Sequence, residues 1–305
     1  MERNPILVTG ASGLIGRVLV ERLRSTGRSV LAVDRVPPVE PAEYEVTIAE
    51  LTDVHRINAL VAAGLDGIIH CGGISGPMVG RDHPAGVIGV NVGGTVNLLE
   101  SARLFAVRRF VFCSSIVAYG ATPAGQSPVD EGAPLTATDI YGASKAAADL
   151  LVRAYAAQHG LDARVGRIGW VYGPRRRTPS VVGRLLRNAL DGVPAVLDHD
   201  GTYPLQLVHL DDVAAALLVL YDSEGIAGRA FNITGGVRTR MADLAALVTA
   251  CVKEADIQFL PGQVLDDYQQ ELFSLSALQD LGWRPKVALE EGVAQYADWL
   301  SKHPY

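Results

Sequence analysis

Tyr141 and Lys145 stand four residues apart in a segment of helical periodicity, and together they could transfer protons. On a helix, residues i and i+4 share a face, with Cβ atoms about 5–6 Å apart. An ammonium at that distance in a partly desolvated cleft favours the phenolate, so the tyrosine becomes a usable general acid–base. A surface cation–aromatic pair has the same spacing. The pair therefore indicates catalysis only if a cofactor site accompanies it.

Three glycines near the start of the chain predict such a site. Gly10, Gly13 and Gly16 follow a short apolar run and open a helical stretch. The first permits a tight turn, the second lets backbone amides approach a pyrophosphate, and the third lets the helix pack closely on a sheet. The helix N-terminus adds free amides and a positive dipole end. The spacing differs by one residue from the commoner G-x-G-x-x-G, and glycines that serve packing alone are the alternative.

An aspartate at the end of the second apolar run favours NAD over NADP as the dinucleotide. Asp34 ends the second apolar run, where a carboxylate can bind both ribose hydroxyls and repel a 2′-phosphate. Arg35 beside it could instead grip that phosphate. Glu50 is expected to meet the adenine edge, while Asp53 is expected to cap the next helix.

Strands that alternate with helices must position these groups. Helical stretches follow or separate apolar runs at residues 6–8, 30–33, 67–70, 109–113 and 163–168. This alternation predicts an α/β fold with a doubly wound parallel sheet of the Rossmann type, which binds ligands at the carboxyl ends of its strands. We expect residues 1–170 to form the dinucleotide-binding domain, with strand returns near 206–236. Residues 171–205 and 237–305 should form a smaller substrate lobe.

Composition narrows the function further. Of 305 residues, 49% are apolar and 20% charged, which permits a large core. The net charge of −6 disfavours nucleic acid as a partner. The three cysteines form no C-x-x-C pair, and His83 and His209 lack metal-ligand spacing, so no metal is expected. The first strand begins at once, and the longest apolar run is too short to span a bilayer, which predicts a cytoplasmic protein without membrane contact.

Taken together and in order, the motifs resemble the extended short-chain dehydrogenase/reductases, specifically the NAD-dependent epimerase/dehydratase group. The resemblance covers nearly the whole chain. It is carried by Gly10-Ala-Ser-Gly-Leu-Ile-Gly16, Asp34, His70-Cys-Gly-Gly73, Asn91-Val-Gly-Gly-Thr95, Ser114-Ser-Ile-Val-Ala-Tyr-Gly120, Tyr141-x-x-x-Lys145, Val171-Tyr-Gly-Pro174 and Val208-His-Leu-Asp-Asp-Val-Ala214.

The resemblance implies roles for individual residues. Tyr141 would be the acid–base, Lys145 would favour its phenolate and hold the nicotinamide ribose, and Ser115 would hydrogen-bond the reacting oxygen. Ser115 is preferred to Ser114 because it lies five residues before Gly120, the usual family distance. The NAD-binding set would comprise Gly10, Ser12, Gly13, Leu14, Ile15, Gly16, Asp34, Arg35, Glu50, Leu51, Cys71, Gly72, Gly73, Asn91, Tyr141, Lys145 and Ile168.

Departures from the family pattern concern the substrate. Members that act on sugar nucleotides carry an asparagine where Trp170 stands and an arginine where Leu205 stands, and both groups bind the diphosphate. An indole and a leucine cannot replace those hydrogen bonds. The turns around Ser75 and Arg167 instead look like those of sugar-acid dehydrogenases such as uronate dehydrogenase. Arg177 could clamp a substrate carboxylate, and Ser75 could bind a hydroxyl, although a solvated loop and a turn cap are the alternatives.

The sequence therefore predicts an NAD-dependent oxidoreductase that acts on a secondary alcohol of a small carbohydrate or sugar acid, with substrate contacts from Ser75, Ser115, Trp170 and Arg177. One alternative is a nucleotide-sugar epimerase or dehydratase, which leaves no net redox change. Another is a non-catalytic NAD-sensing scaffold. Apolar residues Leu98, Leu99, Leu150 and Leu151 on two helices, which family members pair across a twofold axis, predict a homodimer.

Overall fold

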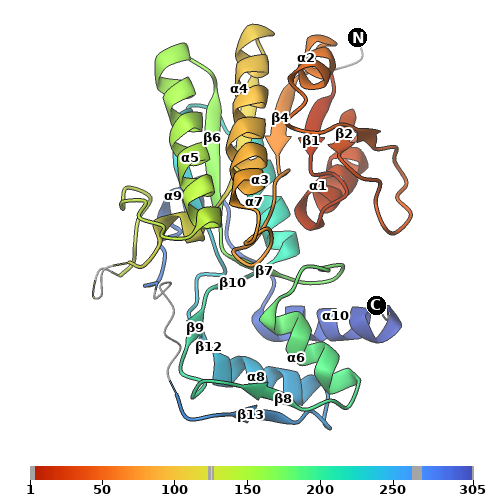
Figure 1. The fold of residues 1–305 in the computed structure, drawn as a ribbon, viewed down its shortest axis with the longest axis vertical. Coiled ribbons are helices and arrows are strands. Elements are labelled where there is room, and N and C mark those ends of the chain that lie inside the picture. The colour runs from red at the N-terminus through yellow and green to blue at the C-terminus, as the bar shows by residue number, and fades with distance from the viewer. Residues whose placement is uncertain (1–3, 123–124, 126, 263–269, 304–305) are drawn as a thin grey trace.

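A seven-stranded parallel sheet forms the centre of the computed structural model (Figure 1), which describes residues 4–122, 125, 127–262 and 270–303. The strand order is β11-β6-β5-β4-β1-β2-β3, and every neighbouring pair runs parallel. The sheet confirms the predicted doubly wound fold. Its strands are β1 (Ile6–Thr9), β2 (Val30–Asp34), β3 (Thr47–Ile48), β4 (Gly67–His70), β5 (Arg109–Ser115), β6 (Ala163–Ile168) and β11 (Ala230–Ile233).

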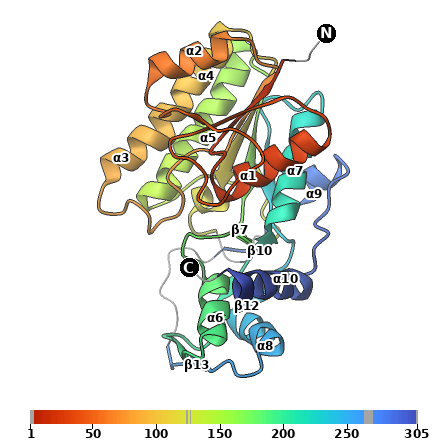
Figure 2. The same ribbon diagram turned by 90° about the vertical axis from the view of Figure 1, so that its right-hand side faces the viewer.

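Helices cover both faces of this sheet (Figure 2), and each layer buries its own apolar core. One layer contains α2 (Val54–Ala62), α4 (Gly94–Leu104) and α5 (Ile140–His159); the other contains α1 (Leu14–Ser25), α7 (Leu210–Asp222) and the short α9 (Ser276–Gln279). Shorter helical segments are α3 (Pro84–Ile88), η1 (Gly89–Gly93) and η2 (Ile116–Tyr119). Among the described residues, no helix has the length and apolarity needed to cross a membrane.

The leucines of α4 belong to the core of the domain. Leu98 and Leu99 are both 0% exposed and pack between the sheet and its helical layer. The expectation that they add exposed apolar surface is therefore wrong, because the helix turns these two residues toward the sheet. Leu150 on α5 is 54% exposed and Leu151 is half-buried, so the uncovered apolar surface of these helices includes α5.

A separate, smaller core lies below the carboxyl ends of the strands (Figure 1), among helices α6, α8 and α10. The parallel pair of β7 and β10 leads into it. Leu275, Leu278 and Trp283 fall within the range expected to form the substrate lobe, yet they pack into the core on the sheet. The elements of this part are β7 (Trp170–Tyr172), α6 (Val181–Leu190), β8 (Ala195–Leu197), β9 (Pro204–Leu205), β10 (Leu207–His209), β12 (Thr239–Arg240), α8 (Met241–Cys251), β13 (Ile257–Phe259) and α10 (Leu289–Lys302).

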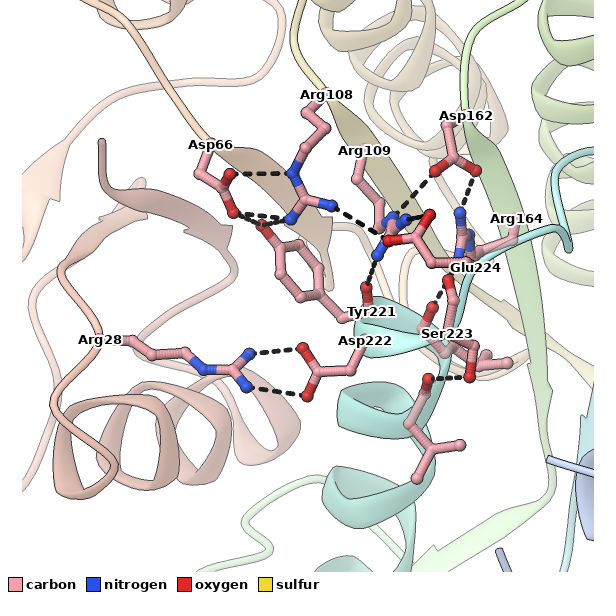
Figure 3. Close-up of polar contacts among 12 residues, drawn as sticks. Arg28, Asp66, Arg108, Arg109, Asp162, Arg164, Tyr221, Asp222, Ser223 and Glu224 are labelled. Carbon is pink, nitrogen blue, oxygen red and sulfur yellow. Dashed lines mark hydrogen bonds and ion pairs between the residues drawn. The ribbon is translucent and has the colours of Figure 1, made fainter. Parts of the chain in front are cut away.

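The amino ends of β4, β5 and β6 carry a cluster of alternating charges, shown in Figure 3. Arg164 donates to the carbonyl oxygens of Leu220 and Ser223 over 2.8 and 2.6 Å, and Arg109 donates to that of Tyr221. These guanidinium groups satisfy the carbonyls at the C-terminus of α7, where the helix dipole also favours positive charge. The cluster thus holds the C-terminus of α7 at the amino ends of the strands, opposite to the end of the sheet where the glycine-rich turns lie.

Candidate active site

The glycine-rich segment forms the predicted turn between β1 and α1. Gly10 has a φ of +69°, and a Cβ there would lie 2.8 Å from the amide nitrogen of Gly72. A Cβ at Gly16 would overlap the Gly10 carbonyl, which explains why α1 can pack so closely on the turn. Gly13 is the N-cap of α1 and supplies no side chain to bind the first amides of the helix. Those amides remain available to an anion.

Asp34 ends β2 beside this turn. Its Oδ2 accepts a hydrogen bond from the Ser12 amide at 3.0 Å, and its Oδ1 accepts one from the Arg35 amide at 2.7 Å. The Ser12 hydroxyl in turn donates to the carbonyl of Val36 at 2.7 Å. The carboxylate is therefore held at the strand end where a dinucleotide's adenosine ribose lies in this fold. The side chain of Arg35 is exposed.

The turn after β4 contacts the glycine-rich turn after β1. Gly72 is buried against Gly10, and a Cβ on Gly72 would lie 3.0 Å from Cδ1 of Leu51. Leu51 is 9% exposed and therefore packs beneath this turn, whereas Glu50 beside it is exposed. Gly73 has a φ of +151°, and a Cβ there would lie 2.9 Å from Oδ1 of Asn91. Only glycines allow these turns to approach so closely.

A buried histidine connects the turns after β1 and β4 with the helix α4. His70 is 1% exposed; its Nδ1 lies 2.7 Å from Oγ1 of Thr9, and its Nε2 lies 3.0 Å from Oγ1 of Thr95. Thr9 Oγ1 accepts from the Gly72 amide, and Thr95 Oγ1 donates to the Asn91 carbonyl. These partners fit a neutral imidazole with its proton on Nε2. Burial, together with the positive charge of Lys145, lowers the pKa of His70 to about 3.

Asn91 extends this network to the helix that carries the proton-transfer pair. It lies in the π-helical segment η1, an irregularity that frequently occurs at functional sites. Its side-chain amide accepts from the Ile74 amide at 2.8 Å and donates to Oγ of Ser144 at 3.0 Å. Ser144 donates to the carbonyl of Tyr141 at 2.7 Å. The first turn of α5 is thereby fixed relative to the turn after β4.

Tyr141 and Lys145 occupy one face of the start of α5, as predicted. Asp139 caps this helix and accepts a hydrogen bond from the Gly142 amide at 3.0 Å. The Lys145 ammonium donates to the carbonyl of Cys113 at 2.9 Å and lies 5.0 Å from the centre of the Phe112 ring. Both members of the pair are buried, and within the described residues the Tyr141 hydroxyl has no hydrogen-bond partner.

The two candidate serines end β5 in different environments. Ser115 caps the short helix η2, and its Oγ accepts from the Val117 amide at 3.2 Å, so its hydroxyl proton remains free to be donated. Oγ of Ser114 is buried without a hydrogen-bond partner among the described residues. Ile168 ends β6 directly beside Ser115 in the sheet register. The assignment of Ser115 stays a prediction.

Trp170 and Leu205 line a cavity of about 650 Å³ between α6, β8 and the segment after β7. Leu205 is 5% exposed, and Leu207 and Met241 also contribute apolar surface. Charged side chains also line this cavity. The four arginines that line it are Arg176, Arg177, Arg184 and Arg187.

The arginines after Pro174 have partners within the protein. Arg177 pairs with Glu40 at 3.0 Å, and Arg175 pairs with Glu21 at 3.0 Å. These contacts place Arg177 between the loop after β2 and the cavity. Ser75 is exposed on the loop after β4. The substrate roles of Arg177 and Ser75 stay predictions.

Sequence reasoning missed the residues that hold the site together. Thr9, Thr95 and Ser144 link His70 and Asn91 to the turns and to α5. The weak signal in the sequence was Asn91 and Thr95 at helical i,i+4 spacing after a histidine that ends an apolar strand. Arg184, an exposed cavity residue, gave no signal at all.

Three independent features of the site suit the binding of a dinucleotide. Two turns approach so closely that a Cβ at Gly10 would meet Gly72, the N-terminal amides of α1 lack a side-chain cap, and a carboxylate ends β2. The residues that would hold NAD are those of the glycine-rich turn, Asp34, the turn after β4 and Lys145. Within the described residues, no cluster of three or more His, Cys, Asp or Glu side chains could hold a metal ion.

Comparisons with known proteins agree with this geometry. Residues 6–234 match the model of the "NAD dependent epimerase/dehydratase family". The chain is 32% identical to the UDP-glucose 4-epimerase of Mycolicibacterium smegmatis, covering 96% of this chain and 97% of that protein. It is 29% identical to the dTDP-glucose 4,6-dehydratase of Streptomyces griseus, covering 98% and 94%.

A solved structure gives the same result for the fold and the cofactor. The UDP-glucose 4-epimerase of Thermus thermophilus, in complex with NAD, superimposes with a TM-score of 0.86 at 27% identity, covering 97% of this chain and 98% of that one. On these matches, the chain belongs to the NAD-dependent epimerase/dehydratase family, whose enzymes are of the extended short-chain dehydrogenase/reductase type and use NAD.

Proposed function

We propose that the protein oxidises a secondary alcohol of a carbohydrate through Ser115, Tyr141 and Lys145. One observation carries this proposal. Lys145 lies one helical turn after Tyr141 on α5, and its ammonium is held by the Cys113 carbonyl, at the end of the sheet where the glycine-rich turns lie. A sensor that only binds the dinucleotide needs those turns but not an acid–base pair beside them.

Each residue has a defined task in this proposal. Tyr141 removes the proton of the substrate hydroxyl, and the nearby positive charge of Lys145 favours the phenolate that does so. Ser115 donates a hydrogen bond to the reacting oxygen and so holds it beside the phenol. NAD, held by the glycine-rich turn, Asp34 and the turn after β4, would supply the hydride acceptor for the carbon that carries this oxygen.

We further propose that the substrate is a small carbohydrate or a sugar acid. Trp170 and the buried Leu205 form apolar walls where a diphosphate would need hydrogen bonds. Burying a diphosphate against them would leave its charges poorly paired, at a cost of several kcal/mol. Arg177 and Arg184 at the same cavity could each bind one carboxylate.

The second candidate is a nucleotide-sugar epimerase or dehydratase. Two observations favour it: the matched relatives bear names of that kind, and a cavity of about 650 Å³ is large enough for a nucleotide. In that reaction the hydride returns to the sugar, so no NADH accumulates.

Product analysis separates the two candidates. The protein is incubated with NAD and either free aldoses and uronic acids or UDP- and dTDP-sugars, and both NADH absorbance and the sugar products are followed. Net NADH formation from a free sugar or sugar acid supports the first candidate. Conversion of a nucleotide sugar without NADH supports the second, and NAD binding without turnover of any sugar supports the sensing scaffold.

We also propose a homodimer and a cytoplasmic location. The exposed Leu150 on α5 supports an interface on that helix, and the free thiols of the three cysteines suit a reducing compartment. Light scattering at micromolar concentration tests the dimer, and a monomeric mass together with an unchanged mass for Leu150→Glu would argue against it.

A further inference from the structure

We propose that Cys71 and Cys113 form an oxidation site, at which a hydroperoxide converts the two thiols into a disulfide. This disulfide distorts the cofactor turn, by which we mean the glycine turn after β4, and the lysine anchor, by which we mean the Cys113 carbonyl that binds Lys145. The two sulfur atoms lie 3.4 Å apart, and both thiols are free. Neither side chain has a role as a thiol in the proposed reaction. The third cysteine, Cys251, is exposed at the end of α8 and serves as an internal reference.

The sheet register places the two cysteines opposite each other. His70 pairs with Phe112 in the parallel ladder of β4 and β5, and each cysteine is the next residue along its own chain segment. Neighbouring strands are about 4.8 Å apart, and disulfides span Cα separations of about 4.4–6.8 Å. Both side chains also pack on the same sheet face. The backbone spacing and the side-chain direction therefore both suit a disulfide.

Both cysteines are attached to the groups that bind cofactor and carry catalysis. The backbone carbonyl of Cys113 accepts the hydrogen bond from the Lys145 ammonium at 2.9 Å. Cys71 directly precedes Gly72, and its amide donates to the Thr9 carbonyl at 3.2 Å. A disulfide needs the sulfur atoms at about 2.05 Å. Closing the gap from 3.4 Å pulls on both the glycine turn and the lysine anchor.

The order of the chemistry follows from exposure. Cys71 is partly exposed while Cys113 is buried, so Cys71 meets the oxidant first. Its thiolate attacks the peroxide oxygen and gives a sulfenic acid and an alcohol or water. The Cys113 sulfur then displaces water from that sulfenic acid, so that one peroxide oxidises two thiols to one disulfide.

The resting protein is protected from this reaction. The hydrogen bond with Cys113 and burial both raise the pKa of Cys71, and the charge of Lys145 opposes this rise only partly. The thiol is therefore protonated at neutral pH, and the disulfide is expected to form slowly and only with an excess of peroxide.

The experiment treats the purified full chain with hydrogen peroxide, blocks the remaining thiols and maps them by mass spectrometry. The expected product has a Cys71–Cys113 disulfide, with one thiol left of three. NAD binding by calorimetry should become at least about tenfold weaker, which corresponds to a loss of about 1.4 kcal/mol. Dithiothreitol should restore it. Calorimetry makes this readout independent of the proposed function, because no substrate is needed.

Single variants supply the controls. Cys71→Ser and Cys113→Ser should each lose the peroxide-dependent drop in NAD affinity, measured against the untreated form of the same variant. Cys251→Ser should respond like the natural chain. Oxidation confined to Cys251, or a Cys71 sulfinic acid without a disulfide, would overturn the proposed site. A disulfide that leaves NAD affinity unchanged would overturn its effect on the cofactor turn.

Discussion

Arg167 and Asp149 form a bidentate ion pair in the interior of the protein, between β6 and α5. Nε and Nη2 of Arg167 donate to Oδ2 and Oδ1 of Asp149 over 2.8 and 3.1 Å, and the two side chains are 1% and 0% exposed. Arg167 also donates to the Tyr119 hydroxyl at 2.7 Å. The pair fastens the helix that carries Tyr141 to the sheet, and it gives Arg167 a structural place rather than one at the substrate.

Removing one member of this pair should destabilise the fold strongly. Arg167→Leu removes the bidentate partner of the buried Asp149 carboxylate and leaves it only the partly exposed Arg153, for which we expect a loss of about 3–5 kcal/mol in the free energy of unfolding. Urea unfolding monitored by circular dichroism measures it. Arg153→Gln is the matched control, because Arg153 binds the same carboxylate at 2.9 Å from a partly exposed position and should cost less than about 1 kcal/mol. Equal losses in the two variants would contradict this account.

Substitutions of Tyr141 and Lys145 should affect turnover and NAD binding differently. Tyr141→Phe removes only the hydroxyl, which has no partner among the described residues, so turnover should cease while NAD binding stays nearly unchanged. Lys145→Met should impair both, since its ammonium lies beside Gly73 as well as one turn from Tyr141. Steady-state kinetics and calorimetry test the two variants together. Substantial activity in Tyr141→Phe would show that the catalytic assignment is wrong.

Asp34 should determine the preference for NAD over NADP. Its carboxylate is held by the amides of Ser12 and Arg35, and a fixed negative charge there repels a 2′-phosphate. Asp34→Asn keeps hydrogen-bond acceptance and removes the charge, so it should narrow the preference with less damage to the turn than Asp34→Ala. Titration of both dinucleotides into each variant measures this. NADP bound as well as NAD by the natural chain would contradict the prediction and indicate Arg35 as the phosphate partner.

The charged cluster in Figure 3 should make stability depend on pH in the acid range. Hydrogen bonds from Arg108 at 2.9 and 2.8 Å lower the pKa of Asp66 below its ordinary value, and the Tyr221 hydroxyl adds to the effect. Because the folded-state pKa is the lower one, this stabilisation is present above about pH 4, the unfolded value, and is lost as pH falls through the folded value.

A comparison of two asparagine variants across pH isolates this contribution. Asp66→Asn should lower stability at pH 7, and this penalty should shrink at an acid pH below the folded-state pKa of Asp66, where the carboxylate is protonated in both states. Asp298→Asn removes an exposed partner of Lys302 and should have little effect at either pH. An Asp66→Asn penalty that is the same at both pH values would refute the electrostatic origin.

The fold and the turns at the carboxyl ends of the strands were predictable from the sequence, because periodicity and glycine spacing are local signals. The strand that ends at Asp34 and the helix that begins beside Tyr141 lie within a residue or two of their expected bounds. Long-range partners were not predictable. Nothing local indicates that Arg177 pairs with Glu40 or that Leu98 faces the sheet, since both depend on how distant elements pack.

The arginines of the substrate cavity give the most specific prediction about the ligand. Arg177 is bound to Glu40 in the loop after β2, whereas Arg184 lines the same cavity from an exposed position with no ion pair in the described part of the chain. Both should contact an anionic substrate equally in the ground state and the transition state. Arg177→Ala and Arg184→Ala should therefore raise KM and leave kcat nearly unchanged. A lost charge-assisted hydrogen bond costs about 1.5–3 kcal/mol, so the rise should be roughly ten- to a hundred-fold.

Glu40→Gln distinguishes a substrate contact from a purely structural role of Arg177. It removes the charge that holds the guanidinium while the guanidinium itself remains, so a substrate-binding Arg177 predicts an unchanged or lower KM for an acidic substrate. If Arg177 only fastens the loop, Glu40→Gln should raise KM as Arg177→Ala does. Unchanged KM values in both arginine variants, or tight binding of a UDP- or dTDP-sugar in the cavity, would exclude the compact acidic substrate. The second result would also explain the nucleotide-sized cavity, with Trp170 and Leu205 packing against the base or ribose instead of the diphosphate.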